Sequence, residues 1–166
     1  MDISILYEDD DLLAIDKPPG VVVNRAESVK GETVQDWTET YLSFPRRRES
    51  NDSDFESMAG IVHRIDKETS GILLIAKNPI AFEKLQSQFK DRTIKKTYLA
   101  LVHGDLVPSE GEIRAPVGRL PWNRERFGIV PGGKEAVTRF KAVSSQQSAA
   151  SNEKITLVEL YPETGR

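Results

Sequence analysis

The 166-residue sequence contains no cysteine, only two histidines and only two methionines. Without cysteine there are no disulfides or thiolate ligands, and two histidines are too few for a structural zinc site. We therefore expect no metal, and the lack of disulfides fits a reducing cytoplasm. No apolar run approaches 18 residues, and the start, Met1 to Ser4, lacks the basic and apolar regions of a signal peptide. This predicts no transmembrane helix, no membrane partner and a cytoplasmic location.

The charge of the chain is unevenly distributed, although its net value is only −3. Residues 1–36 carry 3 basic and 9 acidic side chains, a net of −6, whereas residues 59–139 carry 14 basic and 9 acidic, a net of +5. A local basic face can bind phosphate whatever the global charge is. Charge alone favours the simpler interpretation, an ordinary mixed-charge surface.

The first part of the chain predicts two strands, Ile3–Tyr7 and Leu12–Asp16, joined as a hairpin by an acidic turn. The β-branched run Val21–Val23 predicts another strand, and helical spacing of apolar residues predicts a helix over Thr33–Leu42. Residues 43–58 are polar and lack periodicity, which predicts a flexible loop. Three adjacent arginines in this loop either meet phosphate or are simply solvated.

The second part predicts a buried strand at Ile72–Ala76 and a helix that starts after Asn78 and Pro79 and runs to about Arg92. A turn is expected at residues 108–111. Four further strands are expected, at Thr97–His103, Phe127–Val130, Ala136–Val143 and Ile155–Tyr161. Many strands, few helices and no regular alternation of the two indicate an α+β fold with a mainly antiparallel sheet. At this length one domain is the default.

The most informative segment is His63 to Lys77. Asp66 lies between the basic residues Arg64 and Lys67, and a Thr-Ser-Gly turn and an apolar run follow it. Positive neighbours and a tight turn keep a carboxylate ionised and fixed, as a nucleophile requires. Taken alone, an aspartate with basic neighbours more often forms a surface salt bridge.

This segment resembles the catalytic motif of the RluA-type pseudouridine synthases, which isomerise uridine within RNA. The residues Ile5–Val23 resemble the family's opening segment with its Lys-Pro-x-Gly turn. Lys96–Tyr98 is similar to its Lys-x-Tyr motif, and Thr164–Arg166 is similar to the start of its third motif. The four motifs also occur in the family's order.

The resemblance implies a catalytic-domain fold of the pseudouridine synthase type, with a curved mixed sheet and a central cleft for RNA. It implies that Asp66 is the catalytic aspartate and that no cofactor is needed. Tyr98 would lie against the uracil and help to remove the carbon-5 proton. Arg166 would form an ion pair with the aspartate, keeping the carboxylate ionised and oriented.

Three more residues are candidate substrate contacts on this resemblance. Arg64 would contact RNA and occupy the space left by a flipped base, or it would form an ion pair that fixes the turn. Lys96 would position phosphate or pair with a carboxylate. His63 would lie near the RNA, or it would simply hydrogen-bond the backbone.

Family members continue beyond the Thr-Gly-Arg motif, so residues 1–166 are expected to form a single catalytic domain that is incomplete at its C-terminus. We expect a monomer that binds rRNA or tRNA and isomerises specific uridines. An inactive RNA-binding module of the same family is the main alternative. A glycosidase that acts without RNA is a third, although no second carboxylate stands at a recognisable position.

Overall fold

The computed structural model describes residues 1–44, 54–147 and 153–165. The chain divides into two compact units, Met1–Thr93 and Ile94–Arg166. Within the described ranges, no helix is long and apolar enough to cross a membrane.

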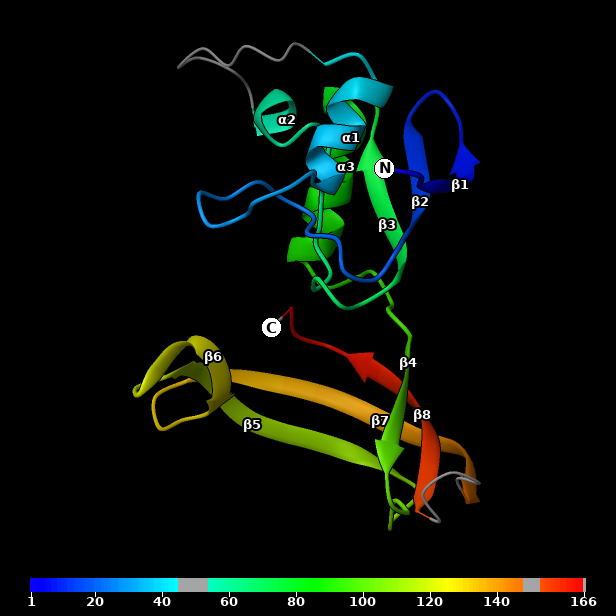
Figure 1. Cartoon of the computed structure of the whole chain (residues 1–166), viewed down its shortest axis with the longest axis vertical. Coiled ribbons are helices and arrows are strands. Elements are labelled where there is room, and N and C mark those ends of the chain that lie inside the picture. The colour runs from blue at the N-terminus through cyan, green and yellow to red at the C-terminus, as the bar shows by residue number, and fades with distance from the viewer. Residues whose placement is uncertain (45–53, 148–152, 166) are drawn as a thin grey trace. The chain divides into compact units, whose positions relative to one another are not determined.

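The first unit contains a three-stranded antiparallel sheet of order β1-β2-β3 (Figure 1). Its strands are β1 (Ser4–Glu8), β2 (Leu12–Lys17) and β3 (Gly71–Ala76). The central strand β2 joins two segments that are more than 50 residues apart in the sequence. Its inward side chains and those of β3 form the core of the unit, with Leu13, Ile15, Leu73 and Ile75 all fully buried.

Three helices complete the first unit: α1 (Val34–Tyr41), α2 (Asp54–Ser57) and α3 (Pro79–Lys90). A capping box, in which Thr33 and Asp36 bond each other's backbone N–H, begins α1. The side chain of Asn78 accepts from the Ala81 N–H and caps α3, which has proline in its first turn. Both helix starts therefore satisfy backbone N–H groups that lack partners within the helix.

The second unit is a five-stranded sheet of order β4-β8-β7-β5-β6 (Figure 1). Every strand pairing recorded in it is antiparallel. The strands are β4 (Tyr98–His103), β5 (Glu110–Leu120), β6 (Asn123–Ile129), β7 (Lys134–Gln147) and β8 (Lys154–Pro162). The α+β class with mainly antiparallel strands is confirmed, with the strands divided between two sheets.

The predicted strand at Val21–Val23 is wrong, because these residues serve the neighbouring helix instead. The carbonyl oxygens of Val22 and Val23 accept from the N–H groups of Val34 and Gln35, each at 3.0 Å. The first N–H groups of a helix need partners outside it, and this segment supplies them. The β-branched run therefore joins neither sheet.

The turn expected at residues 108–111 is wrong in its last two residues, because β5 begins at Glu110, and this strand was not predicted. Two glycines and Pro116 hide this strand from a propensity argument. Proline is tolerated there because the ladder between β5 and β6 begins one residue later, at Val117. Of the expected loop over residues 43–58, residues 45–53 lie outside the described residues, and Asp54–Ser57 form one turn of helix.

Candidate functional site

The segment that carries the candidate aspartate alternates between buried and exposed side chains. Ile61 and Ile65 are buried, with exposed fractions of 3% and 7%, whereas Arg64 and Asp66 are exposed. An isolated bridge from Ile61 to Ile75 holds the start of the segment on β3. The alternation presents Arg64 and Asp66 to solvent, where a substrate can reach them.

Asp66 stands at the start of the turn that leads back into β3. Its carbonyl oxygen accepts from the Thr69 N–H at 3.1 Å, and Gly71 begins the strand with φ of +119°. The ion pair between Lys67 and Glu68 spans 3.9 Å, and both of its side chains are well exposed. This surface pair adds little stability, so the turn is held mainly by its backbone contacts.

The turn is joined to the opening segment by Lys17, whose side chain is fully buried. Its Nζ donates to the carbonyl oxygens of Pro18 at 3.0 Å, Val21 at 2.8 Å and Lys67 at 3.1 Å. The Gly20 N–H donates to the same Lys67 oxygen at 2.8 Å. One buried ammonium therefore fastens the Lys-Pro-Pro-Gly turn to the turn that bears the aspartate.

Burial lowers the pKa of Lys17, and the nearby carboxylates of Glu68 and Asp66 act against that shift. The ammonium thus lies within electrostatic reach of the candidate catalytic carboxylate. Lys17 was not among the site residues predicted from the sequence. The sequence did contain a pattern that indicates its burial. Leu13, Ile15 and Lys17 occupy alternate positions of one strand, which places the lysine on the same face as the two apolar residues.

His63 also makes contacts within the first unit. The Leu74 N–H donates to its Nε2 at 2.9 Å. Its ring stacks on Phe89 of α3, with centroids 4.5 Å apart and an interplanar angle of 22°. The backbone hydrogen bond that the sequence left open as an alternative is therefore present, and a contact of His63 with RNA stays a prediction.

Tyr98 and Lys96 belong to the second unit. Tyr98 is the first residue of β4, lies opposite Leu160 of β8 and is half-buried. Lys96, two residues earlier, is also half-buried, whereas Thr97 between them is exposed. This alternation places Lys96 and Tyr98 on the same face of the chain.

The Thr-Gly-Arg motif is fixed to β7 through its threonine. The Val137 N–H donates to Thr164 Oγ1 at 3.1 Å, and the Glu163 N–H donates to the Val137 oxygen at 2.9 Å. Thr164 is buried, and the two hydrogen bonds to Val137 keep the segment after β8 alongside β7. Arg166 lies outside the described residues, and its ion pair with Asp66 stays a prediction.

The structure thus places His63, Arg64 and Asp66 on one segment of the first unit and Lys96 and Tyr98 in the second. Across residues 1–44, 54–147 and 153–165, no group of three or more His, Asp or Glu side chains could hold a metal ion.

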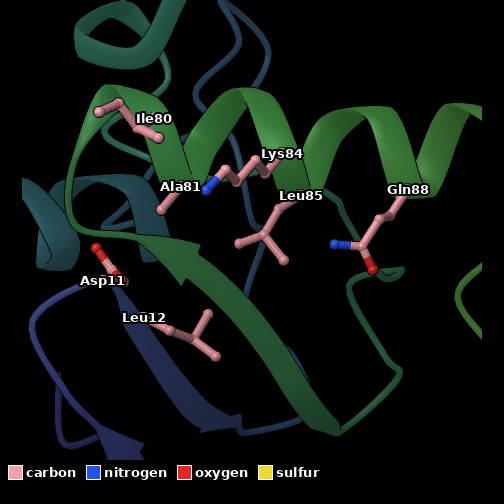
Figure 2. Close-up of a pocket in the computed structure, with 7 residues that line it drawn as sticks. All are labelled: Asp11, Leu12, Ile80, Ala81, Lys84, Leu85 and Gln88. Atoms are coloured by element: carbon pink, nitrogen blue, oxygen red, sulfur yellow. The ribbon is translucent and has the colours of Figure 1, made fainter.

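A shallow groove of about 220 Å³ lies elsewhere in the first unit, between the start of β2 and α3 (Figure 2). None of the predicted site residues is among those that line it, which are Asp11, Leu12, Ile80, Ala81, Lys84, Leu85 and Gln88. The candidate site therefore rests on the exposed aspartate and its anchors rather than on this groove.

Known proteins match the chain along nearly its whole length. The family model described as RNA pseudouridylate synthase matches residues 11–166. An RNA pseudouridine synthase of Bacillus subtilis, YlyB, is 37% identical over 166 residues, which are 100% of this chain and 51% of that protein. The ribosomal large subunit pseudouridine synthase D of Nitrosomonas europaea is 39% identical over 164 residues, 99% of this chain and 43% of that one.

Solved structures agree with these matches. Human RNA pseudouridylate synthase domain containing 1 has a TM-score of 0.75 at 25% identity, covering 99% of this chain and 61% of that one. Human RNA pseudouridylate synthase domain containing 4 has a TM-score of 0.69 at 22% identity, covering 98% and 60%, and supports the fold alone.

The chain belongs to the RNA pseudouridylate synthase family. This confirms the resemblance found in the motifs. The chain spans about half the length of the curated relatives that it matches, 51% of the Bacillus subtilis protein and 43% of the Nitrosomonas europaea protein.

Proposed function

We propose that this protein is a pseudouridine synthase, an isomerase that acts on uridine in RNA, and that Asp66 is its catalytic residue. The observation that carries the proposal is the exposed carboxylate of Asp66 on a turn that buried groups hold from both ends. Such a carboxylate is reachable by substrate yet fixed in position, which is what a nucleophile needs. Membership in the family supports this chemistry.

The reaction rearranges bonds within one nucleotide and needs no oxidant or reductant. The bond from ribose carbon-1′ to base N1 breaks, the base rotates, and a bond from carbon-1′ to base carbon-5 forms. The proton on carbon-5 then leaves, and N1 gains a proton. Asp66 acts as the nucleophile or stabilising anion at the first step, and Tyr98 helps to remove the carbon-5 proton at the last.

The remaining candidate site residues bind the RNA or orient Asp66 and take no part in bond breaking. Arg64 shares the exposed side of the segment with Asp66, so it can contact the RNA next to the reacting nucleotide. A stacked or paired uridine must be extruded before a carboxylate can reach its sugar, and an arginine can occupy the vacated space. Lys96 positions a phosphate, and Arg166 pairs with Asp66.

For the substrate class we propose rRNA. Relatives from Nitrosomonas europaea and Neisseria meningitidis that are 37–39% identical over nearly the whole chain are named ribosomal large subunit pseudouridine synthase D. A tRNA substrate is the alternative. Incubating the protein with total rRNA and total tRNA, each labelled at uridine carbon-5, would separate the two.

The test of the proposed function is release of tritium from RNA labelled at uridine carbon-5. Asp66→Asn should abolish release while RNA affinity stays within about twofold, because the amide keeps the size of the side chain and loses its charge. Glu68→Gln is the matched control, since it removes an exposed carboxylate two residues away and should leave release unchanged. Release by Asp66→Asn at the parent rate would exclude Asp66 as the catalytic residue.

A second candidate function is RNA binding without turnover. The observation that favours it is the charge of residues 59–139, which carry 14 basic and 9 acidic side chains and could bind phosphate without any chemistry. It predicts RNA affinity that falls steeply with salt and no tritium release from the parent chain. Any release that depends on Asp66 would contradict it.

A further inference from the structure

At the edge of β3 that faces away from β2, the backbone N–H groups of Ala76 and Leu74 find different kinds of partner. β3 is the last strand of its sheet, with β2 on its other side. The Ala76 N–H donates to the carbonyl oxygen of Gly60 at 2.8 Å, as a strand partner would arrange. The Leu74 N–H donates instead to the His63 side chain at 2.9 Å. An imidazole thus takes the place of a backbone carbonyl at this edge.

The hydrogen bond determines the protonation state of the ring. A nitrogen that accepts from an N–H carries no proton, so His63 is neutral and its ring proton resides on Nδ1. The stack on Phe89 fixes the plane of the ring and aims Nε2 at the strand edge. Both contacts come from elements that also form the core of the first unit.

We propose that His63 is a positioning residue, which holds the segment carrying Asp66 against the edge of β3. This rests on the proposed function, because it assigns His63 its role through Asp66. His63 lies between Ile61, which bridges to β3, and the buried Ile65, so it supplies the polar anchor between two apolar ones. Beyond Ile65 the chain turns and exposes the aspartate. Lys17 holds the far side of that turn through the Lys67 oxygen.

The placement of a nucleophile matters more than its mere presence. A displacement of about 1 Å can lower a rate by two orders of magnitude, whereas binding of a long RNA depends on many contacts. Loss of the His63 anchor should therefore reduce the rate of isomerisation and leave RNA affinity nearly unchanged. If His63 instead contacted the RNA, its loss should reduce RNA affinity and leave the rate of isomerisation at saturating RNA nearly unchanged.

The first test reads the tautomer directly, by long-range nitrogen–proton NMR on the full chain labelled with ¹⁵N. The chain has only two histidines, so His103→Gln assigns the spectrum by removing the exposed one on β4. The expected result is an unprotonated Nε2 and a protonated Nδ1 on His63 near neutral pH. A proton on Nε2 would overturn the proposal, because that nitrogen could not accept from Leu74.

The second test compares two substitutions of His63, each of which keeps one contact of the imidazole ring and removes the other. His63→Phe keeps an aromatic ring over Phe89 and lacks the acceptor, whereas His63→Gln keeps an acceptor of similar reach and lacks the ring. Hydrogen exchange at the Leu74 amide should accelerate about tenfold in His63→Phe and recover in His63→Gln. Exchange at the Thr69 amide, which donates to the Asp66 oxygen, should change in the same direction. Unchanged exchange at Thr69 would overturn the link to the catalytic turn, whatever the activity.

The same two variants are then compared in single turnover at saturating RNA. His63→Phe should lose about tenfold or more in rate with RNA affinity within about twofold, and His63→Gln should regain most of that rate. Equal rates for the two variants, or a loss of affinity that matches the loss of rate, would overturn the proposal. Full activity of Asp66→Asn would instead refute the proposed function. The tautomer and hydrogen-exchange results do not depend on activity, so they would still show whether His63 holds the segment on β3.

Discussion

The side-chain ammonium of Lys17 lies 3.1 Å from the backbone carbonyl oxygen of Lys67, 50 residues further along the chain. The two other carbonyl oxygens that Lys17 contacts, those of Pro18 and Val21, belong to the turn that follows β2. A fully buried cation is tolerated because each of its three protons finds an acceptor. This one side chain therefore joins two turns that the sequence shows only as separate motifs.

Lys17→Met should destabilise the protein by about 2–4 kcal/mol, since it keeps the aliphatic stem and leaves three carbonyl oxygens without their shared donor. Urea unfolding at neutral pH measures this change. Lys67→Ala is the matched control, because the Lys17 contact uses only its backbone oxygen and its side chain is exposed. That variant should stay within about 0.5 kcal/mol of the parent. Equal losses in the two variants would show that the Lys17 contacts add no stability.

Gly60→Ala should destabilise the first unit by at least about 3 kcal/mol. Gly60 has φ of +72°, and a Cβ there would overlap the carbonyl oxygen of Ala76, which lies in β3. Gly20→Ala separates the two causes, because Gly20 has φ of +83° and nothing within 4 Å of the added carbon. The control should lose only about 1–2 kcal/mol from its backbone conformation. Thermal or urea unfolding of both variants checks the difference, and similar losses would show that the overlap relaxes easily.

Most of the fold could be predicted from the sequence because local signals and burial agree there. The cap of α3 and the apolar run of β3 each indicate one structure. β5 could not be predicted, since its partners β6 and β7, rather than its own glycines and proline, make it a strand. Val21–Val23 misled the prediction for the opposite reason, because a strong local preference found no neighbouring strand.

The candidate site, like the fold, could be predicted from the sequence only in part. The motifs identify Asp66, and the alternation of the segment explains why its carboxylate is exposed. The contacts that hold it could not be predicted, because Lys17 and Lys67 meet only through the folded chain. Likewise, His63 accepts a hydrogen bond from the Leu74 N–H at the edge of β3, and no local sequence pattern predicts this contact. The sequence therefore indicates the reacting group better than the groups that orient it.

Glu8→Gln should destabilise the protein at neutral pH, and the difference from the parent should vanish in acid. Hydrogen bonds from Lys77 and then Tyr41 hold the pKa of Glu8 below its ordinary value of 4.5. A carboxyl group with a lowered pKa stabilises the fold above its unfolded-state value, and the effect is lost as pH falls through the folded-state value. Urea midpoints of parent and variant, measured from pH 7 down past 4.5, should therefore converge.

The partner of Glu8 provides the control for this pH dependence. Lys77→Met removes the larger cause of the lowered pKa, so Glu8→Gln in that background should have a smaller effect at pH 7. An unchanged effect would assign the stabilisation to Tyr41 instead.

Arg126→Gln should weaken RNA binding and reduce the slope of log affinity against log salt by about one. Arg126 is an exposed residue of β6, in the part of the chain with an excess of positive charge. An exposed guanidinium that meets a phosphate releases a counterion from the RNA, and this release produces the salt slope. Arg114→Gln is the matched control, because Arg114 on β5 already forms ion pairs with Glu112 and Glu135. Its loss should change the slope less. Fluorescence anisotropy of a labelled RNA across a salt series measures both variants, and equal slopes for Arg126→Gln and the parent would exclude β6 from the phosphate-binding surface.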